Sequence, residues 1–172
     1  MLEKIRDDLV ADTGRRGLLA FLAALLLSPG FYTVFLHRLT ASLYARGVVG
    51  RALGKLVWRI MVMTTGCHIH PQARIAGGLK LPHPVAIIVG MGAQIGAGVT
   101  LYQSVTIGVS KETDTYPTIG EGTKIFPGAV LVGPITIGAR STVGANAFVS
   151  IDSPEDALLV GAPARIVPRR GG

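Results

Sequence analysis

Residues 119–149 read IGEGTKIFPGAVLVGPITIGARSTVGANAFV, and an aliphatic residue returns at every sixth position of this stretch. The same spacing extends back to Ile69, with a two-residue slip between Ile87 and Val89. An amphipathic helix needs apolar residues at spacings of three and four, and a two-faced strand needs strict alternation. Because neither template fits, the stretch predicts a fold built from short internal repeats. The repeated aliphatic residues are Ile69, Ile75, Leu81, Ile87, Val89, Ile95, Leu101, Ile107, Ile119, Ile125, Leu131, Ile137, Val143 and Val149.

The geometry of a six-residue repeat indicates a triangular coil. Six residues of extended chain cover about 20 Å, and the small residue that follows most of the aliphatics lets the chain turn a corner. Three such sides close one coil with the aliphatic side chains inside. Each coil buries its aliphatics only because the next coil covers them. We therefore predict a parallel β-helix over residues 66–152, preceded by a helical segment at 1–65 and followed by a tail at 153–172.

The helical segment divides into four predicted helices. Residues 1–12 place acidic side chains among apolar ones, a pattern typical of a short amphipathic helix. An uncharged run at 17–36 follows and is interrupted by Ser28-Pro29-Gly30. Serine at the N-cap and proline at the first helical position mark a helix start. We expect helices near 15–27 and 29–46, and a last one at 48–64.

Composition limits the class of partner. The net charge is +7 at pH 7, but only 6% of the residues are aromatic. A stacking platform for bases is therefore missing, and we expect no nucleic-acid partner. The positive charge indicates either a solvated basic surface or a surface that attracts phosphates or an anionic membrane. The single cysteine, Cys67, excludes an internal disulfide and suits a reducing compartment.

The uncharged run leaves a membrane contact open. Its roughly ten apolar residues before the break are too few for a membrane span. A cleaved signal peptide is disfavoured because an acidic segment precedes the run and no Ala-x-Ala site follows it. Attachment through the apolar face with Arg15, Arg16 and Arg38 is the alternative. We expect a cytoplasmic protein, with peripheral contact at the inner face of the membrane as that alternative.

Four short motifs occur in order along the chain: HIHP at 68–71, GLKLPH at 78–83, VTIG at 105–108 and VGAPARIV at 160–167. Together with the repeat, they resemble the serine acetyltransferase branch of the hexapeptide-repeat acyltransferases, from about residue 28 to residue 167. The resemblance implies a left-handed β-helix, a homotrimer and acetyl-CoA as the acetyl donor. The helical segment is shorter than in that family, which leaves open whether trimers pair into hexamers.

The resemblance also implies catalytic residues. His83 matches the histidine that deprotonates the acceptor hydroxyl, at the family's distance from Ile87. Tyr116 stands where the family has a second histidine, His68 where it has the carboxylate that orients the base, and Pro82 where it has the aspartate that holds serine. A surface histidine is the plainer alternative for His83, and a loop aromatic is the plainer alternative for Tyr116.

His68 and His70 flank the inward-pointing Ile69, so both point outward from one strand. Cys67 beside them faces the other way, and we expect no metal site there. For His68 we expect instead a contact that supports His83.

The changed positions bear on the acceptor. The residues that hold a zwitterionic amino acid in the family are lost, whereas the base is kept. Transfer of an acetyl group to oxygen needs one base beside the thioester. Short acetyltransferases of polysaccharide gene sets, such as the colanic-acid type, are similar in length and also lack the second histidine. We predict a saccharide hydroxyl as the acceptor. Serine is the first alternative, and a non-catalytic trimeric binding or scaffold protein is the second.

For acetyl-CoA the resemblance implies a groove between two subunits. Small residues at coil corners would let the pantetheine arm approach backbone amides, although Pro127 has no N–H to offer. Arg165 would lie near the 3′-phosphate, with Arg169 and Arg170 as further candidates. A solvated basic tail is the plainer alternative for these arginines. The corner residues are Gly108, Gly128, Gly144 and Ala145.

Overall fold

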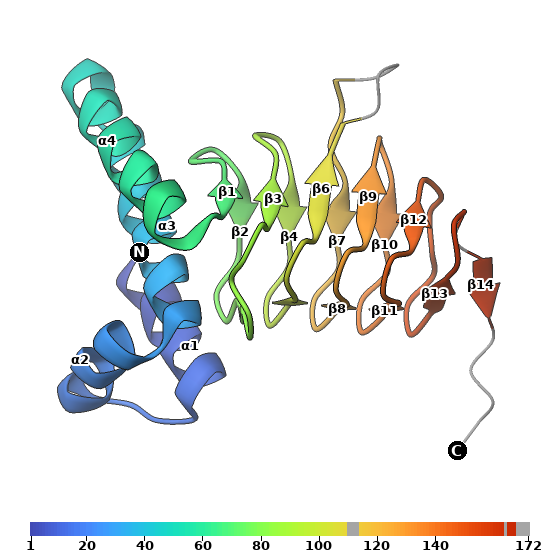
Figure 1. Ribbon diagram of the computed structural model, residues 1–172, viewed down its shortest axis with the longest axis horizontal. Helices are drawn as coiled ribbons and strands as arrows, with labels where there is room; N and C mark the ends of the chain where they lie inside the picture. Colours follow the sequence, from blue (N-terminus) through green and yellow to red (C-terminus); the bar gives the residue numbers. More distant parts are fainter. Residues whose placement is uncertain (110–113, 164, 168–172) are drawn as a thin grey trace.

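A computed structural model describes residues 1–109, 114–163 and 165–167 of the chain. Four helices gather at one end, and three stacked columns of short strands extend from them toward the C-terminus (Figure 1). The predicted residues Arg169 and Arg170, and residues 110–113 of the loop before Tyr116, lie outside the described part.

The helices are α1 (Leu2–Thr13), α2 (Leu18–Leu27), α3 (Pro29–Tyr44) and α4 (Gly47–Thr65). The predicted start of α3 is confirmed, because the Ser28 hydroxyl accepts a hydrogen bond from the Phe31 amide at 3.2 Å. The second helix begins three residues later than expected, after Gly17. Helices α3 and α4 pack closely at Gly54, where an added Cβ would lie 3.1 Å from the Tyr44 nitrogen.

The strands confirm the predicted parallel β-helix. They form three sheets, one for each side of the coil, and neighbours within a sheet come from successive coils. All pairs are parallel except the last, β13 with β14. The first sheet contains β1 (His68–Ile69), β3 (Ile88–Val89), β6 (Thr106–Gly108), β9 (Val130–Val132) and β12 (Phe148–Val149). The second contains β2 (Arg74–Ile75), β4 (Gln94–Ile95), β7 (Thr118–Ile119) and β10 (Thr136–Ile137). The third contains β5 (Thr100–Leu101), β8 (Lys124–Ile125), β11 (Thr142–Val143), β13 (Leu158–Val160) and β14 (Arg165–Val167).

The repeated aliphatics are buried inside the coils and stack on one another. On the first side, Ile69 pairs with Val89, Val89 with Ile107, and Ile107 with Leu131. All four side chains are at most 1% exposed. The slip at residue 88 and the extra residues after Ile107 therefore leave the stacking intact.

Two corners of the coil use left-handed backbone angles. Glycine was expected there, and it holds one corner in three coils, at Gly78, Gly98 and Gly122. In the coils that follow, larger residues adopt positive φ at this corner. The expectation that small residues fill the corners is therefore only partly right. Arg140 and Asp156 do so on neighbouring coils, where their side chains bond each other at 3.0 and 3.2 Å. The other corner column is Ala86, Ser104, Gly128 and Asn146.

No single helix in the described ranges is long and apolar enough to cross a membrane. Helices α2 and α3 pass such a test only as a pair, and they meet at a bend of 104°.

Candidate functional site

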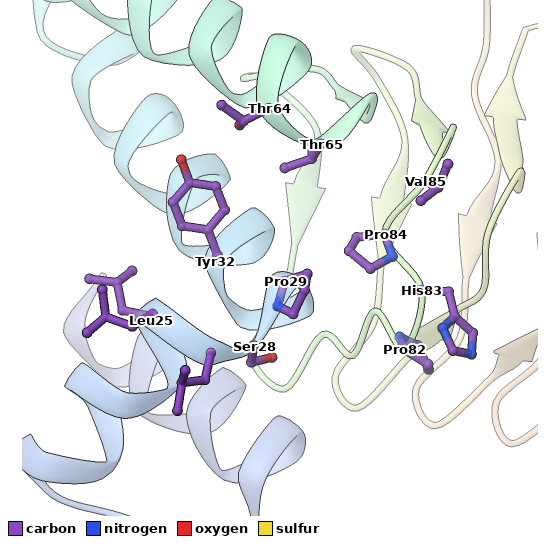
Figure 2. A pocket seen from close by; sticks show the side chains of 12 residues that line it. Leu25, Ser28, Pro29, Tyr32, Thr64, Thr65, Pro82, His83, Pro84 and Val85 are labelled. Atoms are coloured by element: carbon purple, nitrogen blue, oxygen red, sulfur yellow. The ribbon is translucent and has the colours of Figure 1, made fainter.

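His83 lies at the corner that opens the second coil, exposed at the border between the helices and the β-helix. It lines a pocket of ≈ 600 Å³ between the two parts of the molecule. Figure 2 shows Pro29 and Tyr32 of α3 and Thr64 and Thr65 of α4 on one side of the pocket, and the loop that carries His83 on the other. Except for His83, the lining side chains are uncharged: Leu25, Leu26, Leu27, Ser28, Pro29, Tyr32, Thr64, Thr65, Pro82, Pro84 and Val85.

The loop around His83 is held by its own backbone. Pro82 and Pro84 fix the φ angle on each side of the histidine. The Val85 amide donates to the His83 carbonyl at 2.8 Å, which closes a tight turn. Two residues before His83, the buried side chain of Leu81 anchors the loop to the core. His83 is therefore held in a restrained turn at the edge of the pocket.

An aromatic column runs from His83 along this corner. The His83 ring centroid lies 6.5 Å from that of Tyr102 on the next coil. Tyr102 in turn stacks on Phe126 of the following coil, with centroids 5.0 Å apart and planes at 11°. Sequence reasoning missed both residues. A usable signal existed, since each directly follows a repeated aliphatic, Leu101 or Ile125.

His68 lies in a different pocket from His83. Its ring centroid is 6.1 Å from that of Trp58 on α4, and His70 is 6.2 Å from the same indole. These residues line a pocket of ≈ 500 Å³. Burial lowers the pKa of His70. Among the described residues, the structure records no contact between His68 and His83, although one was expected.

Cys67 is fully buried inside the first coil, as its alternation with His68 implies. Burial raises the pKa of its thiol, which favours the uncharged form. Across the described ranges, no three His, Cys, Asp or Glu side chains are grouped so that they could hold a metal ion.

Tyr116 packs against a corner instead of projecting into solvent. Its half-buried ring lies over Gly90 and Gly92, and a Cβ added at Gly92 would come within 2.5 Å of Cδ2. The same ring contacts the buried core. This geometry supports a packing role for Tyr116 at the base of the loop.

The residues predicted for acetyl-CoA lie along the last three coils. The amide of Gly128 donates to the Gln103 carbonyl at 3.1 Å, and that of Gly144 donates to the Leu159 carbonyl at 2.8 Å. Both N–H groups are therefore already used within the coil. The space that a Cβ would fill is taken as well, by the Asn146 side chain at Gly128 and by Val160 at Gly144.

Gly144 and Arg165 come together at the final coil. A Cβ at Gly144 would lie 3.1 Å from Cγ1 of Val160, and Val160 pairs with Arg165 in the terminal hairpin. Arg165 and Ala145 are exposed beside this strand pair. Gly108 lies earlier, at the end of β6, and pairs with Val132 of the next coil.

The repeat and the coil geometry define a β-helix of the hexapeptide-repeat class. In agreement, the family described as "Bacterial transferase hexapeptide (six repeats)" matches residues 116–150. Serine acetyltransferase from Mycobacterium tuberculosis is 36% identical over 150 residues, covering 84% of this chain and 65% of that protein. Serine acetyltransferase from Bacillus subtilis is 32% identical over 154 residues, covering 88% of this chain and 70% of that protein.

Among solved structures, the Brucella abortus serine acetyltransferase in complex with coenzyme A superposes with a TM-score of 0.87 at 29% identity. The match covers 99% of this chain and 68% of that one. The chain belongs to the serine acetyltransferase family of acyltransferases. The expected closeness to polysaccharide acetyltransferases receives no support from these comparisons.

Proposed function

We propose that this protein transfers the acetyl group of acetyl-CoA to a hydroxyl oxygen. The observation that carries the proposal is His83, held by a proline-flanked turn at the edge of a pocket of the size of a small-molecule site. Membership of the serine acetyltransferase family and the coenzyme A complex of the Brucella relative support the donor.

In this reaction His83 acts as the general base. Its unprotonated ring nitrogen takes the proton of the acceptor hydroxyl while the oxygen attacks the thioester carbon. The C–O bond forms, the C–S bond breaks, and the proton returns from the imidazolium to the departing thiolate. The products are the acetyl ester and free CoA.

The donor would lie along the corners from His83 toward the last coil. The pantetheine arm would pass the corners at Gly128 and Gly144, and the exposed guanidinium of Arg165 would pair with a phosphate. We expect a second subunit of a homotrimer to complete the groove, as the resemblance to the family implies.

Serine is the first acceptor to test, because the relatives are named serine acetyltransferases. It takes precedence over the saccharide predicted from the changed positions. A saccharide hydroxyl is the second candidate. It is favoured by the uncharged lining of the His83 pocket, which offers no counter-charge to an ammonium or a carboxylate.

The test measures CoA release by the purified protein with serine, nucleotide sugars or deacetylated polysaccharide. His83→Ala should lower the rate by about 10²–10⁴, the usual contribution of a positioned base, with little change in acetyl-CoA affinity. His70→Ala is the matched control, since it removes a histidine outside this pocket. Failure to bind acetyl-CoA contradicts the proposal, as does full activity of His83→Ala with the preferred acceptor. Turnover of a saccharide but not of serine selects the second candidate.

A further inference from the structure

The helical segment exposes large apolar side chains on two helices. On α2 the leucines that point outward are 46–84% exposed, and on α4 the outward side chains are 43–84% exposed. The opposite face of α4, at Gly50, Gly54 and Met61, packs inside the protein. The exposed set is Leu18, Leu19, Leu22, Leu26, Leu27, Val48, Val49, Leu53, Leu56, Ile60 and Met63.

This apolar set occurs in a stretch that carries only positive charge. Residues 13–65 contain seven Lys and Arg and no Asp or Glu. Arg38 is buried against Asp8, whereas the other six cations are exposed. They are Arg15, Arg16, Arg46, Arg51, Lys55 and Arg59.

On α4 the charges and the apolar side chains are arranged in adjacent stripes. Arg51, Lys55 and Arg59 follow one another at spacings of four, which places them on one side of the helix. The apolar stripe beside them runs from Val49 to Met63 at alternating spacings of four and three. An amphipathic helix with Lys and Arg next to an apolar stripe is typical of helices that lie in a membrane interface.

We propose that the exposed apolar side chains of α2 and α4, with the six exposed cations, form a docking surface for an anionic lipid bilayer. Charge complementarity selects this occupant. A second copy of the chain would bring the same six cations against themselves, and like charges oppose association. An anionic lipid surface attracts each of them.

Docking has a consequence for the site. The C-terminal ends of α2 and α4 both line the His83 pocket, through Leu26, Leu27 and Thr64. A protein held by these helices would therefore have this pocket close to the lipid surface. The helices lie in the plane of the interface, in keeping with the finding that no single helix among the described residues is both long and apolar enough to cross a membrane.

The experiment is co-sedimentation of the full chain with vesicles of phosphatidylcholine, with and without phosphatidylglycerol. We expect binding to the anionic vesicles on the order of 10³–10⁴-fold tighter than to the neutral ones, and loss of that difference at high salt. The triple variant Arg51→Gln, Lys55→Gln, Arg59→Gln should weaken binding on the order of 100-fold, since each cation near the surface contributes roughly fivefold.

The matched control removes three exposed cations of the β-helix, in Arg74→Gln, Lys80→Gln, Lys124→Gln, and should bind vesicles as the unchanged protein does. Equal loss in both triple variants would assign binding to net charge and overturn the docking surface. Leu53→Gln with Leu56→Gln should also weaken binding, whereas Ile151→Gln at the far end should not.

The proposal is overturned if the unchanged protein does not bind anionic vesicles. It is also overturned if the two α4 leucine changes dissolve an oligomer and leave lipid binding intact, because the surface then belongs to a second copy. Circular dichroism checks that each variant is folded.

Discussion

Arg38 of α3 holds the carboxylate of Asp8 on α1 through two hydrogen bonds, from Nε to Oδ2 at 2.9 Å and from Nη2 to Oδ1 at 3.1 Å. The Arg38 side chain is 5% exposed and the Asp8 side chain is 1% exposed. Its remaining bonds reach the β-helix, since Arg38 also donates to the Ile75 carbonyl at 2.8 Å and Asp8 accepts from the Leu79 amide at 3.0 Å. One buried ion pair therefore ties two helices to the first coil, beside the elements that carry the His83 pocket.

Asp8→Ala should be strongly destabilising. It leaves the buried guanidinium without its counter-charge, and breaking a buried pair in this way typically lowers the free energy of unfolding by about 3–5 kcal/mol. Chemical denaturation measures the change. Arg140→Gln is the control, because Arg140 pairs with Glu155 and Asp156 at the surface, where its loss should shift the transition only slightly. Similar shifts for both variants would show that the Asp8 pair does not hold the helices in place.

The repeat made the β-helix predictable, because its period follows directly from the geometry of a triangular coil. Each buried aliphatic, such as Ile107 or Leu131, is identifiable from the count alone. The start of α3 was equally local, since Ser28 and Pro29 satisfy the capping requirement within four residues. Features set by neighbouring residues in the chain were therefore accessible from sequence.

Features set by packing between coils were not. Tyr116 contacts Gly90 and Gly92, more than twenty residues away, and no periodicity indicates that contact. His68 matched a position in a family motif, but its surroundings depend on Trp58 from α4. The pocket of His83 likewise depends on how α2 and α3 meet the first coils, which the repeat does not determine.

Tyr116→Phe separates the two roles considered for this residue. If the ring packs over the glycines and does no acid chemistry, the phenylalanine variant should keep both its activity and its melting temperature. Tyr116→Ala should lower the free energy of unfolding by about 3–5 kcal/mol at most, less in proportion to the ring's partial exposure. Initial rates and thermal unfolding are measured on both variants. A hundredfold loss of rate in Tyr116→Phe at unchanged stability would show that the Tyr116 hydroxyl takes part in catalysis.

Tyr102→Ala tests the aromatic column. Removing the ring between His83 and Phe126 deletes a stacked pair worth about 0.5–1.5 kcal/mol beyond its buried area, and it removes the surface beside the histidine. We expect the rate to fall by about tenfold or more through misplacement of the base, while Tyr102→Phe, which keeps the ring, stays close to the unchanged protein. An alanine variant with an unaltered rate would exclude Tyr102 from positioning His83.

The buried His37 on α3 should make the protein lose stability in mild acid. Its side chain is 1% exposed and its Nδ1 has no hydrogen-bond partner in the described structure. Burial, followed by the positive charges of Arg38 and Lys4, lowers its pKa from 6.5 to about 3. Between pH 6.5 and about pH 3, His37 therefore binds a proton in the unfolded chain but not in the folded one. The contribution of neutral His37 to the free energy of unfolding is therefore fully present above pH 6.5. It is lost as the pH falls below that value, by about 1.4 kcal/mol per pH unit.

His37→Asn removes this proton, so its unfolding free energy should depend less steeply on pH between about 6 and 4. Denaturant titrations of both proteins across that range give the two slopes, and their difference isolates His37 because every other titrating group is shared. The variant has its own cost at neutral pH, since a shorter side chain leaves a buried gap, but that cost is independent of pH and does not affect the comparison. Parallel slopes would mean that His37 accepts its proton in the folded protein, and hence that α3 opens to water around it.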